Sequence, residues 1–425
     1  MRLNLHLPER EIEAKDMTIE NSTKKQPDLI CLSHLRWNFV WQRPQHLLSR
    51  FARGQRVFFV EEPIVAAGST ARLDVQAHES GVHVVVPYVS QESWDSGTVE
   101  NVLRELFDSL FTSQNIDEFF FWYYTPMAFE WTKHKKPLAI VYDCMDELSA
   151  FKNAPPELIE REREIYKVAD LVFTGGQSLF EAKRELHEKV FAFPSSIEVE
   201  HFAQAREITE QPADQKSIKH PRFGFIGVID ERLDIELLGK IAQLRPDWQF
   251  VMIGPVVKID EKDLPRAANI HYLGGKKYDE LPAYLASWDV ALLPFALNES
   301  TKFISPTKTP EYLAAGLPVV STPIRDVVRP YGEMGMVHIA DTPEGFVQSC
   351  EEALNEKREE RLKKVDEFLS HNSWDKTQKQ MADLIEEAID SKRTHDSMVK
   401  NVSVGAGNGE SHLTEKIIPS HGRLA

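Results

Sequence analysis

Residues 298–322 combine a cation, an acid and hydroxyl groups at helical spacing. They read NESTKFISPTKTPEYLAAGLPVVST, in which Ser305 leads into a predicted helix that carries Lys308 and Glu311. The free backbone N–H groups at the start of a helix suit a diphosphate. Lys308 can add a point charge, and Glu311 can accept hydrogen bonds from ribose hydroxyls. The same spacing also fits a solvated i,i+3 ion pair on an ordinary helix.

Three strand-like runs in this half of the chain end on glycine, which lets a backbone approach a phosphate closely. The runs are RFGFIG, WQFVMIG and NIHYLGG, and Arg232 follows the first of them within reach of the same anion. One such glycine is a weak signal, but three on one sheet favour a binding site. We therefore predict a nucleotide site formed by Gly227, Arg232, Gly254, Ser305, Thr307, Lys308 and Glu311.

In the N-terminal half, the first predicted strand is followed by a loop rich in aromatic and cationic residues. The sequence SHLRWNFVWQRP places His34, Arg36, Trp37, Trp41 and Arg43 there. The tryptophans can stack on a sugar ring, and an arginine can clamp an anion that faces the other half. Packing of both indoles into the core is the more common role of tryptophan.

Carboxylates gather after the run LAIV, where the chain reads YDCMDE. Asp143, Asp146 and Glu147 at a strand end can bind a metal, transfer protons or accept hydrogen bonds from sugar hydroxyls. Asp146 can equally cap the turn that follows. The sequence contains no Walker A motif, HExxH, GxGxxG or recognisable hydrolytic triad. We expect no metal site, and Asp143 and Asp146 remain candidates for contacts with a sugar.

These candidate residues follow strands in a chain that alternates strand-like and helix-like runs. Such alternation indicates parallel sheets with helices on both faces, in which ligands bind beyond the carboxyl ends of the strands. We predict two α/β doubly wound domains, because the alternation of strands and helices is interrupted by a polar stretch and continues after it. The expected organisation is a disordered tail at 1–25, a first domain at 26–203, a linker at 204–220, a second domain at 221–372, a helix at 373–390 and a disordered tail at 391–425.

Composition excludes several classes of protein. The formal net charge is −16, and there is no basic stripe of the kind that nucleic-acid binding requires. The 3 cysteines lie far apart and form no CxxC pair, which fits a reducing cytoplasm. No apolar run approaches the length of a membrane span. We expect a cytoplasmic protein with at most peripheral contact with the inner face of the plasma membrane, because its acidic balance disfavours anionic lipid.

Several blocks together resemble the teichuronic-acid-type branch of the family-4 retaining glycosyltransferases. They are WNFVWQRPQHLLSRFA, YDCMDELSAF, DLVFTGGQSLFEAKR, IGVIDERLD, YLGGKKYDELPAYLASWDVALLPF and SPTKTPEYLAAGLPVVST, within residues 28–387. The resemblance implies a GT-B fold, in which two Rossmann-like domains face each other across a cleft. It also implies a UDP- or GDP-sugar as donor, a saccharide or lipid-linked saccharide as acceptor and no required cofactor. Trp374 and the helix after it would cross back to the first domain.

The resemblance also assigns roles to single residues. Glu311 matches the glutamate that binds the ribose, whereas Phe303 stands where a second glutamate is usual. Val228 occupies the place of an arginine, and only Arg232 lies near the expected lysine. In the retaining reaction that this family performs, the leaving diphosphate takes the acceptor's proton. The resemblance therefore implies that Lys308 and Arg232 stabilise developing charge, and that Asp143 or His34 contacts the sugar or acceptor.

Two other functions use the same cleft. One is a GT-B-shaped sugar-nucleotide epimerase or phosphorylase, which product analysis with and without acceptor would separate from a transferase. The other is a non-catalytic nucleotide-sugar-binding protein, motivated by Phe303. It predicts donor binding without donor hydrolysis.

Overall fold

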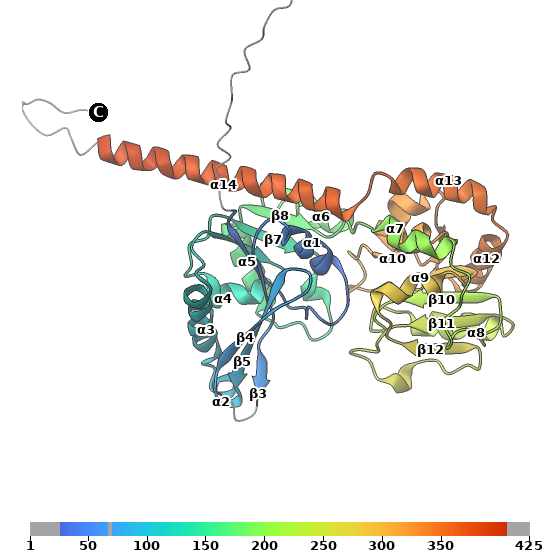
Figure 1. The fold of residues 1–425 in the computed structure, drawn as a ribbon. Coiled ribbons are helices and arrows are strands. Elements are labelled where there is room, and N and C mark those ends of the chain that lie inside the picture. Colours follow the sequence, from blue (N-terminus) through green and yellow to red (C-terminus); the bar gives the residue numbers. More distant parts are fainter. Residues whose placement is uncertain (1–25, 67–69, 406–425) are drawn as a thin grey trace, which may run out of the picture.

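The computed structural model describes residues 26–66 and 70–405 (Figure 1). The expected N-terminal tail, residues 1–25, lies outside the described residues, as does the last part of the expected C-terminal tail, residues 406–425. The described residues form two sheets, and helices pack against each of them. The predicted α/β class is confirmed.

Within the described residues, the first half of the chain builds a 9-stranded sheet in the order β3-β5-β2-β1-β6-β7-β8-β9, with β4 antiparallel to β5. Apolar runs such as VFFV and FFFWY are wholly buried, as expected of strands that helices cover on both faces. The strands are β1 Asp28–Leu32, β2 Val57–Val60, β3 Ile64–Ala66, β4 Arg72–Ala77, β5 Val82–Ser90, β6 Phe119–Tyr123, β7 Ile140–Cys144, β8 Leu171–Thr174 and β9 Val190–Ala192. The main helices are α1 Arg43–Phe51, α2 Gln91–Asp95, α3 Val99–Gln114, α4 Phe129–Thr132, α5 Leu158–Val168, α6 Gln177–Lys183 and α7 Val199–Ala203.

The second half forms a parallel sheet in the order β12-β11-β10-β13-β14-β15. The first strand of this half lies in the interior of the sheet, so its carboxyl end opens at a switch point where ligands bind in such sheets. The strands are β10 Arg222–Ile226, β11 Gln249–Ile253, β12 Ile270–Gly274, β13 Val290–Leu293, β14 Val319–Ser321 and β15 His338–Ile339. The main helices are α8 Ile235–Leu244, α9 Leu281–Leu285, α10 Lys308–Ala314, α11 Arg325–Val327, α12 Pro343–Leu354 and α13 Arg358–Leu369.

Helix α14, Trp374–Gly405, runs back from the second half along the first (Figure 1). Met381, Ile385 and Ile389 bury one face of it against the first sheet's core, and Trp374 stacks on His46 of α1 with ring centroids 4.8 Å apart. The helix continues to Gly405, so the expectation of a disordered tail from residue 391 is wrong for residues 391–405. The polar composition of that stretch misled the prediction, because a helix once nucleated on a packed face propagates at little further cost.

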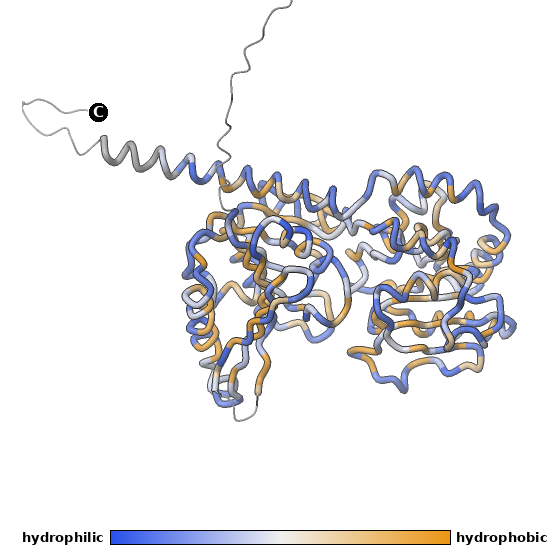
Figure 2. The backbone as a smooth tube through the Cα atoms, in the orientation of Figure 1, coloured by the Kyte–Doolittle hydropathy of each residue, from blue (hydrophilic) through white to orange (hydrophobic). Residues whose placement is uncertain are grey.

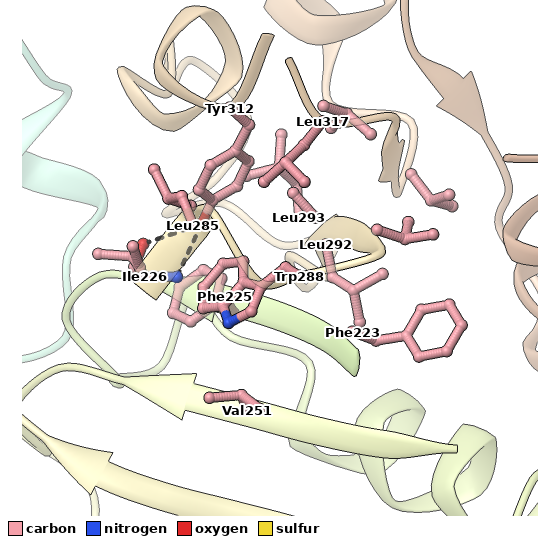
Figure 3. Packing of buried hydrophobic residues seen from close by; sticks show 14 of the residues in the cluster. Phe223, Phe225, Ile226, Val251, Leu285, Trp288, Leu292, Leu293, Tyr312 and Leu317 are labelled. Carbon is pink, nitrogen blue, oxygen red and sulfur yellow. Dashed lines mark hydrogen bonds between the residues drawn. The ribbon is translucent and has the colours of Figure 1, made fainter. Parts of the chain in front are cut away.

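Along the backbone tube, orange is frequent in the strands of the first half, whereas helices such as α14 alternate between blue and orange (Figure 2). In the second half, the core fixes α10 against β10. The Tyr312 hydroxyl accepts a 2.7 Å hydrogen bond from the backbone N–H of Ile226 (Figure 3). Trp288 packs flat on Gly224, where a Cβ would lie 2.1 Å from the indole. These contacts hold the start of α10 at the carboxyl end of β10.

Candidate active site

Two adjoining cavities lie between the two halves of the protein. The smaller, about 110 Å³, is walled by both halves, and the larger, about 520 Å³, extends over the ends of β10, β11 and β12. The larger is of the size that small-molecule sites usually have. Both cavities share Gly227, Val228 and Lys308.

The floor between the cavities is built from glycine. Gly227 and Gly254 have φ values of +156° and +145°, which side chains rarely adopt. A Cβ on Gly254 would lie 1.8 Å from the carbonyl oxygen of Gly227, and one on Gly227 would lie 3.1 Å from Cε of Lys308. The two strand ends therefore meet backbone against backbone, and both predicted glycines line the larger cavity.

Lys308 and Glu311, on the first turn of α10, lie on the same side of the cleft. Burial lowers the pKa of Lys308, although the nearby Glu311 carboxylate opposes that shift. Burial likewise raises the pKa of Glu311, opposed by Lys308. Thr307 and Ser305 line the smaller cavity next to them, and Lys308 Nζ lies 3.3 Å from Thr307 Oγ1. Desolvated charges of this kind are typical of functional sites.

Arg232 lines the smaller cavity from the loop after β10. Its Nε and Nη2 donate hydrogen bonds of 2.7–3.1 Å to the carboxylate of Asp230, which is buried. Its guanidinium carbon also lies 5.6 Å from the ring centroid of Phe151, in the first half. The guanidinium is thereby fixed in orientation, because a bidentate pair restricts its plane.

Asp146 faces Arg232 and Lys308 from the first-half wall of the smaller cavity. Burial raises the pKa of this carboxyl to about 6, although the charges of Arg232, Arg43 and Lys308 oppose the shift. The loop that carries Asp146 is anchored by its neighbour Glu147, whose Oε2 lies 2.8 Å from Lys183 Nζ. Asp146 is therefore the carboxylate that the structure brings to the cleft from the cluster YDCMDE.

For the sugar contact that the sequence predicts at Asp146, we expect turnover to rise with pH through about 6, because the deprotonated carboxylate is the better hydrogen-bond acceptor. Replacement by asparagine should flatten the profile between about pH 5 and 7.

The raised pKa of Asp146 also makes the stability of the fold depend on pH. The protonated carboxyl stabilises the folded state relative to the charged one. This stabilisation is complete below the unfolded pKa of 3.8 and is lost as pH rises through about 6. Asp146→Asn should therefore gain relative stability near pH 7 in thermal unfolding. An Asp146→Asn enzyme that kept the wild-type pH profile would contradict the assignment.

Arg43 and Asp143 form an internal ion pair instead of substrate contacts. Arg43 Nε and Nη2 donate to the two oxygens of Asp143 at 3.0 and 2.9 Å, and Nη1 donates to the carbonyl of Phe193 at 2.7 Å. Asp143 is 0% exposed and lines neither cavity. The expected sugar or catalytic contact of Asp143 is therefore not available here. Arg43 borders the smaller cavity, but its donors are committed to the pair and to Phe193.

The two tryptophans of the first loop have different positions. Trp37 is 2% exposed and packs on Phe59 with ring centroids 5.0 Å apart, so the expectation that it stacks on a sugar is wrong. An indole that packs into the core gains more from burial than one left at the surface. Trp41 does line the larger cavity, and its indole N–H donates to Nδ1 of His46 at 3.3 Å.

His34 and Arg36 do not reach the two cavities. Burial lowers the pKa of His34 to about 4, so its imidazole is neutral at pH 7. Within the described residues, His34 Nδ1 has no hydrogen-bond partner. Arg36 donates to the carboxylate of Glu61 at 2.9 Å and to the carbonyl of Glu62 at 2.6 Å. It borders a separate surface groove, which contradicts its predicted place in the cleft.

Sequence reasoning missed Tyr278, which lines the larger cavity from the turn after β12. Its hydroxyl donates to Glu198 at 3.0 Å, and its ring stacks on His201 with centroids 4.3 Å apart. The tyrosine follows LGGKK, so its place after a glycine-bearing strand end was the available signal. Phe303, which stands where a glutamate is usual, packs against the hydrophobic cluster of the first half instead.

No group of three or more His, Cys, Asp or Glu side chains among the described residues is arranged to hold a metal ion. No helix in residues 26–66 or 70–405 combines the length and apolar character that a membrane crossing needs.

Two doubly wound sheets with a cleft between their strand ends define the GT-B class of fold. Solved structures of this class match most of the chain. Sucrose-phosphate synthase from Thermosynechococcus elongatus has a TM-score of 0.65 and 14% identity, over 86% of this chain and 100% of that one. The E. coli structure described as trehalose-6-phosphate bound with UDP-2-fluoro glucose has a TM-score of 0.61 and 13% identity, over 84% and 98%. The predicted GT-B fold is confirmed.

Sequence comparison gives a family match within the second half. Residues 220–356, which contain Lys308 and Glu311, match the family described as glycosyl transferases group 1. The putative teichuronic acid biosynthesis glycosyltransferase TuaH of Bacillus subtilis (strain 168) is 27% identical over 247 residues, which is 53% of this chain. The match spans 61% of the length of that relative.

Proposed function

We propose that this protein transfers a sugar from a nucleotide diphosphate sugar to a saccharide acceptor, with retention of configuration. The observation that carries the proposal is the convergence of Lys308, Arg232 and the glycine turns of β10 and β11 on one cleft. Two cations and open backbone together suit a diphosphate, which carries two negative charges or more. The match of residues 220–356 to glycosyl transferases group 1 supports the same activity.

In this proposal the nucleotide occupies the larger cavity and the donor sugar the smaller one. Glu311 accepts hydrogen bonds from the ribose, and Trp41 and Tyr278 border the base. The diphosphate lies where the two cavities meet, at Gly227 and Lys308. Fixed donors at that point stabilise the charge that develops as the sugar leaves.

The protein's own contribution to the reaction is positioning and electrostatics. In a retaining transfer without a covalent intermediate, the leaving diphosphate takes the proton of the acceptor hydroxyl on the same face of the sugar. Lys308 and Arg232 stabilise the diphosphate, and Asp146 orients the sugar through its hydroxyls. This arrangement requires no strong base. It agrees with the linings of the two cavities, which contain no histidine among the described residues.

We further propose a UDP- or GDP-sugar donor, no required cofactor and a saccharide or lipid-linked saccharide acceptor in cell-envelope synthesis. The name of the matching relative, a putative teichuronic acid biosynthesis glycosyltransferase, supports the envelope role. The UDP-2-fluoro glucose bound in the E. coli neighbour supports a UDP-sugar as the first donor to test. The acceptor would be met in the cytoplasm, at the inner face of the plasma membrane.

Replacement of Glu311 by alanine tests the nucleotide site. We expect affinity for UDP or GDP to fall about 10- to 100-fold, because hydrogen bonds to a charged group are lost. Isothermal titration calorimetry measures this directly.

Glu299→Ala is the matched control, because Glu299 is exposed and pairs only loosely with Lys302 at 3.6 Å. It should bind nucleotide as the wild type does. Wild-type protein that binds neither UDP nor GDP would refute the proposed function. Unchanged affinity in Glu311→Ala would refute only the assignment of this residue.

A further inference from the structure

A buried carboxylate joins the two halves of the protein beside the cleft. Asp326 lies in α11, just after β14 of the second sheet, and is 6% exposed. Its Oδ1 accepts a 2.9 Å hydrogen bond from the backbone N–H of Ser178, in the first turn of α6. No side chain of the first half caps α6 at its first residue. Asp326 therefore supplies from the opposite half what a capping residue normally supplies locally.

The backbone at this junction leaves no room for a side chain at residue 176. A Cβ on Gly176 would lie 2.2 Å from Asp326 Oδ2 and 2.8 Å from the Cβ of Ser305. The φ of Gly176 is −167°, an extended value that any residue adopts, so space alone requires glycine here. Gly175 and Ser305 both line the smaller cavity, one from each half. The contact with Asp326 thus sets the separation of the two walls of that cavity.

The contact is also unfavourable in part. Within the described residues, Asp326 Oδ2 and the Ser178 hydroxyl are buried without a hydrogen-bond partner. Burial raises the pKa of Asp326, although hydrogen bonds from Ser178 and from the backbone of Gln177 oppose that shift. Buried polar atoms are nearly always satisfied in native proteins, and an exception calls for an explanation.

A second hydrogen bond crosses the cleft close to this junction. The hydroxyl of Ser195, in the first half, donates to the backbone carbonyl of Ser305 at 3.1 Å. Both residues line the smaller cavity. The segment that leads into α10, and hence to Lys308, is therefore held against the first half at two adjacent points, Gly176 and Ser195.

We propose that Asp326 is a positioning residue. It holds the first-half wall of the cleft at a fixed place relative to the second half, which binds the nucleotide. The inference rests on the proposed function, because that function places the donor sugar between these walls. Asp326 acts through the backbone of Ser178 and the turn at 175–176, and it lines neither cavity. Nucleotide binding depends on Lys308 and Glu311, which belong to the second half itself. Loss of Asp326 should therefore lower turnover and leave nucleotide affinity intact.

The test compares Asp326→Ala and Asp326→Asn with the wild type in the full-length chain. We expect the Kd for UDP and GDP to change less than about twofold, while kcat for a panel of UDP- and GDP-sugars falls about 10- to 100-fold in Asp326→Ala. Asparagine retains an acceptor oxygen and should recover most of the turnover. A role in folding alone would not separate kcat from Kd in this way.

The distance between the halves provides a readout that needs no donor sugar. Cysteines placed at Leu186 and Met334, which are 53% and 42% exposed, allow spin labelling, because native Cys31, Cys144 and Cys350 are buried. With UDP or GDP bound, the wild type should give one narrow distance distribution. Asp326→Ala should give a longer and broader one. Equal distributions would overturn the inference.

Glu181→Gln is the matched control, because Glu181 of α6 pairs with Arg325 of α11 and with Arg329 just after it, and both arginines are exposed. It should behave as the wild type. If Asp326→Ala fails to fold, Gly176→Ala decides the question, since its Cβ displaces Asp326 without removing the carboxylate. Wild-type kcat in the variant that folds would overturn the inference and leave the proposed function standing. Absence of nucleotide binding in the wild type would refute the proposed function itself.

Discussion

Replacement of Asp143 by alanine is expected to lower the free energy of unfolding by about 3–5 kcal/mol, because it leaves a buried guanidinium without its carboxylate. Arg43 is 3% exposed and Asp143 is 0% exposed, and two hydrogen bonds join them. Neither charge can recover hydration when its partner is removed. Urea unfolding, followed by circular dichroism, measures the loss.

Asp383→Ala on α14 is the control for this experiment. Asp383 pairs with Lys379 four residues away, and both side chains are exposed, so the loss should stay below about 1 kcal/mol. The double variant Arg43→Met with Asp143→Leu should regain most of the stability, because no uncompensated charge remains. An Asp143→Ala protein as stable as the wild type would contradict the account of this pair.

The ion pair also explains why the sequence misassigned both residues. Asp143 lies at the end of strand β7 and Arg43 begins helix α1, and both positions lie at the end of the sheet where ligands bind. Residue type and strand position are visible in a sequence, but the partner of a charge 100 residues away is not. Asp146, three residues further on, takes the place in the cleft that Asp143 was expected to hold.

The fold was largely predictable, because buried parallel strands read as short apolar runs between helical segments. DLICL, FFFWY and VALL are such runs, and each is a strand in the structure. Strand β4, RLDVQA, was not predicted. It lies outside the main path of the sheet and pairs only with β5, so most of its side chains are partly or fully exposed. A half-buried strand of this kind carries little hydrophobic signal.

The sequence predicted the cavity-lining residues that directly follow strands. It did not predict the positions of loop side chains, which depend on how the loop packs. Gly227, Gly254, Lys308 and Glu311 line the cavities as their positions indicated. By contrast, the burial or exposure of the two tryptophans depends on the path of the loop over the core. Trp37 is buried against Phe59, whereas Trp41 lies at the cavity. Three residues of irregular backbone separate them, and no periodicity predicts which of the two is buried.

Phe303 is the departure from the family pattern that the structure interprets most directly. Its side chain packs against the hydrophobic cluster of the first half, to which Phe121 and Phe129 also belong. A glutamate at this position would bring a charge to that apolar contact at a considerable desolvation cost. The residue therefore joins the two halves, close to where Ser195 and Asp326 also join them. Lys308 and Arg232 are then the cations that the second half contributes to the smaller cavity.

Replacement of Lys308 by alanine is expected to lower kcat about 100- to 1000-fold, the effect of removing one preorganised donor for a developing negative charge. Its ammonium lies where the two cavities meet, and Gly227 leaves just enough space for the lysine chain. Arginine at this position should rescue poorly, because a guanidinium is broader than the gap beside the glycine. Steady-state assays with the donor identified by calorimetry would measure both variants.

Stability should move in the opposite direction to activity at Lys308. Burial lowers the pKa of the ammonium, so the charged form is less favourable in the folded protein than in the unfolded chain at pH 7. Lys308→Met, which keeps the length of the side chain without the charge, should therefore unfold at a higher temperature than the wild type while it loses turnover. Lys302→Met, at an exposed position on the loop before α10, should change neither quantity. If Lys308→Met were destabilised and still fully active, the lysine would be a structural residue, and the diphosphate would have to rely on Arg232 and the backbone of Gly227 alone.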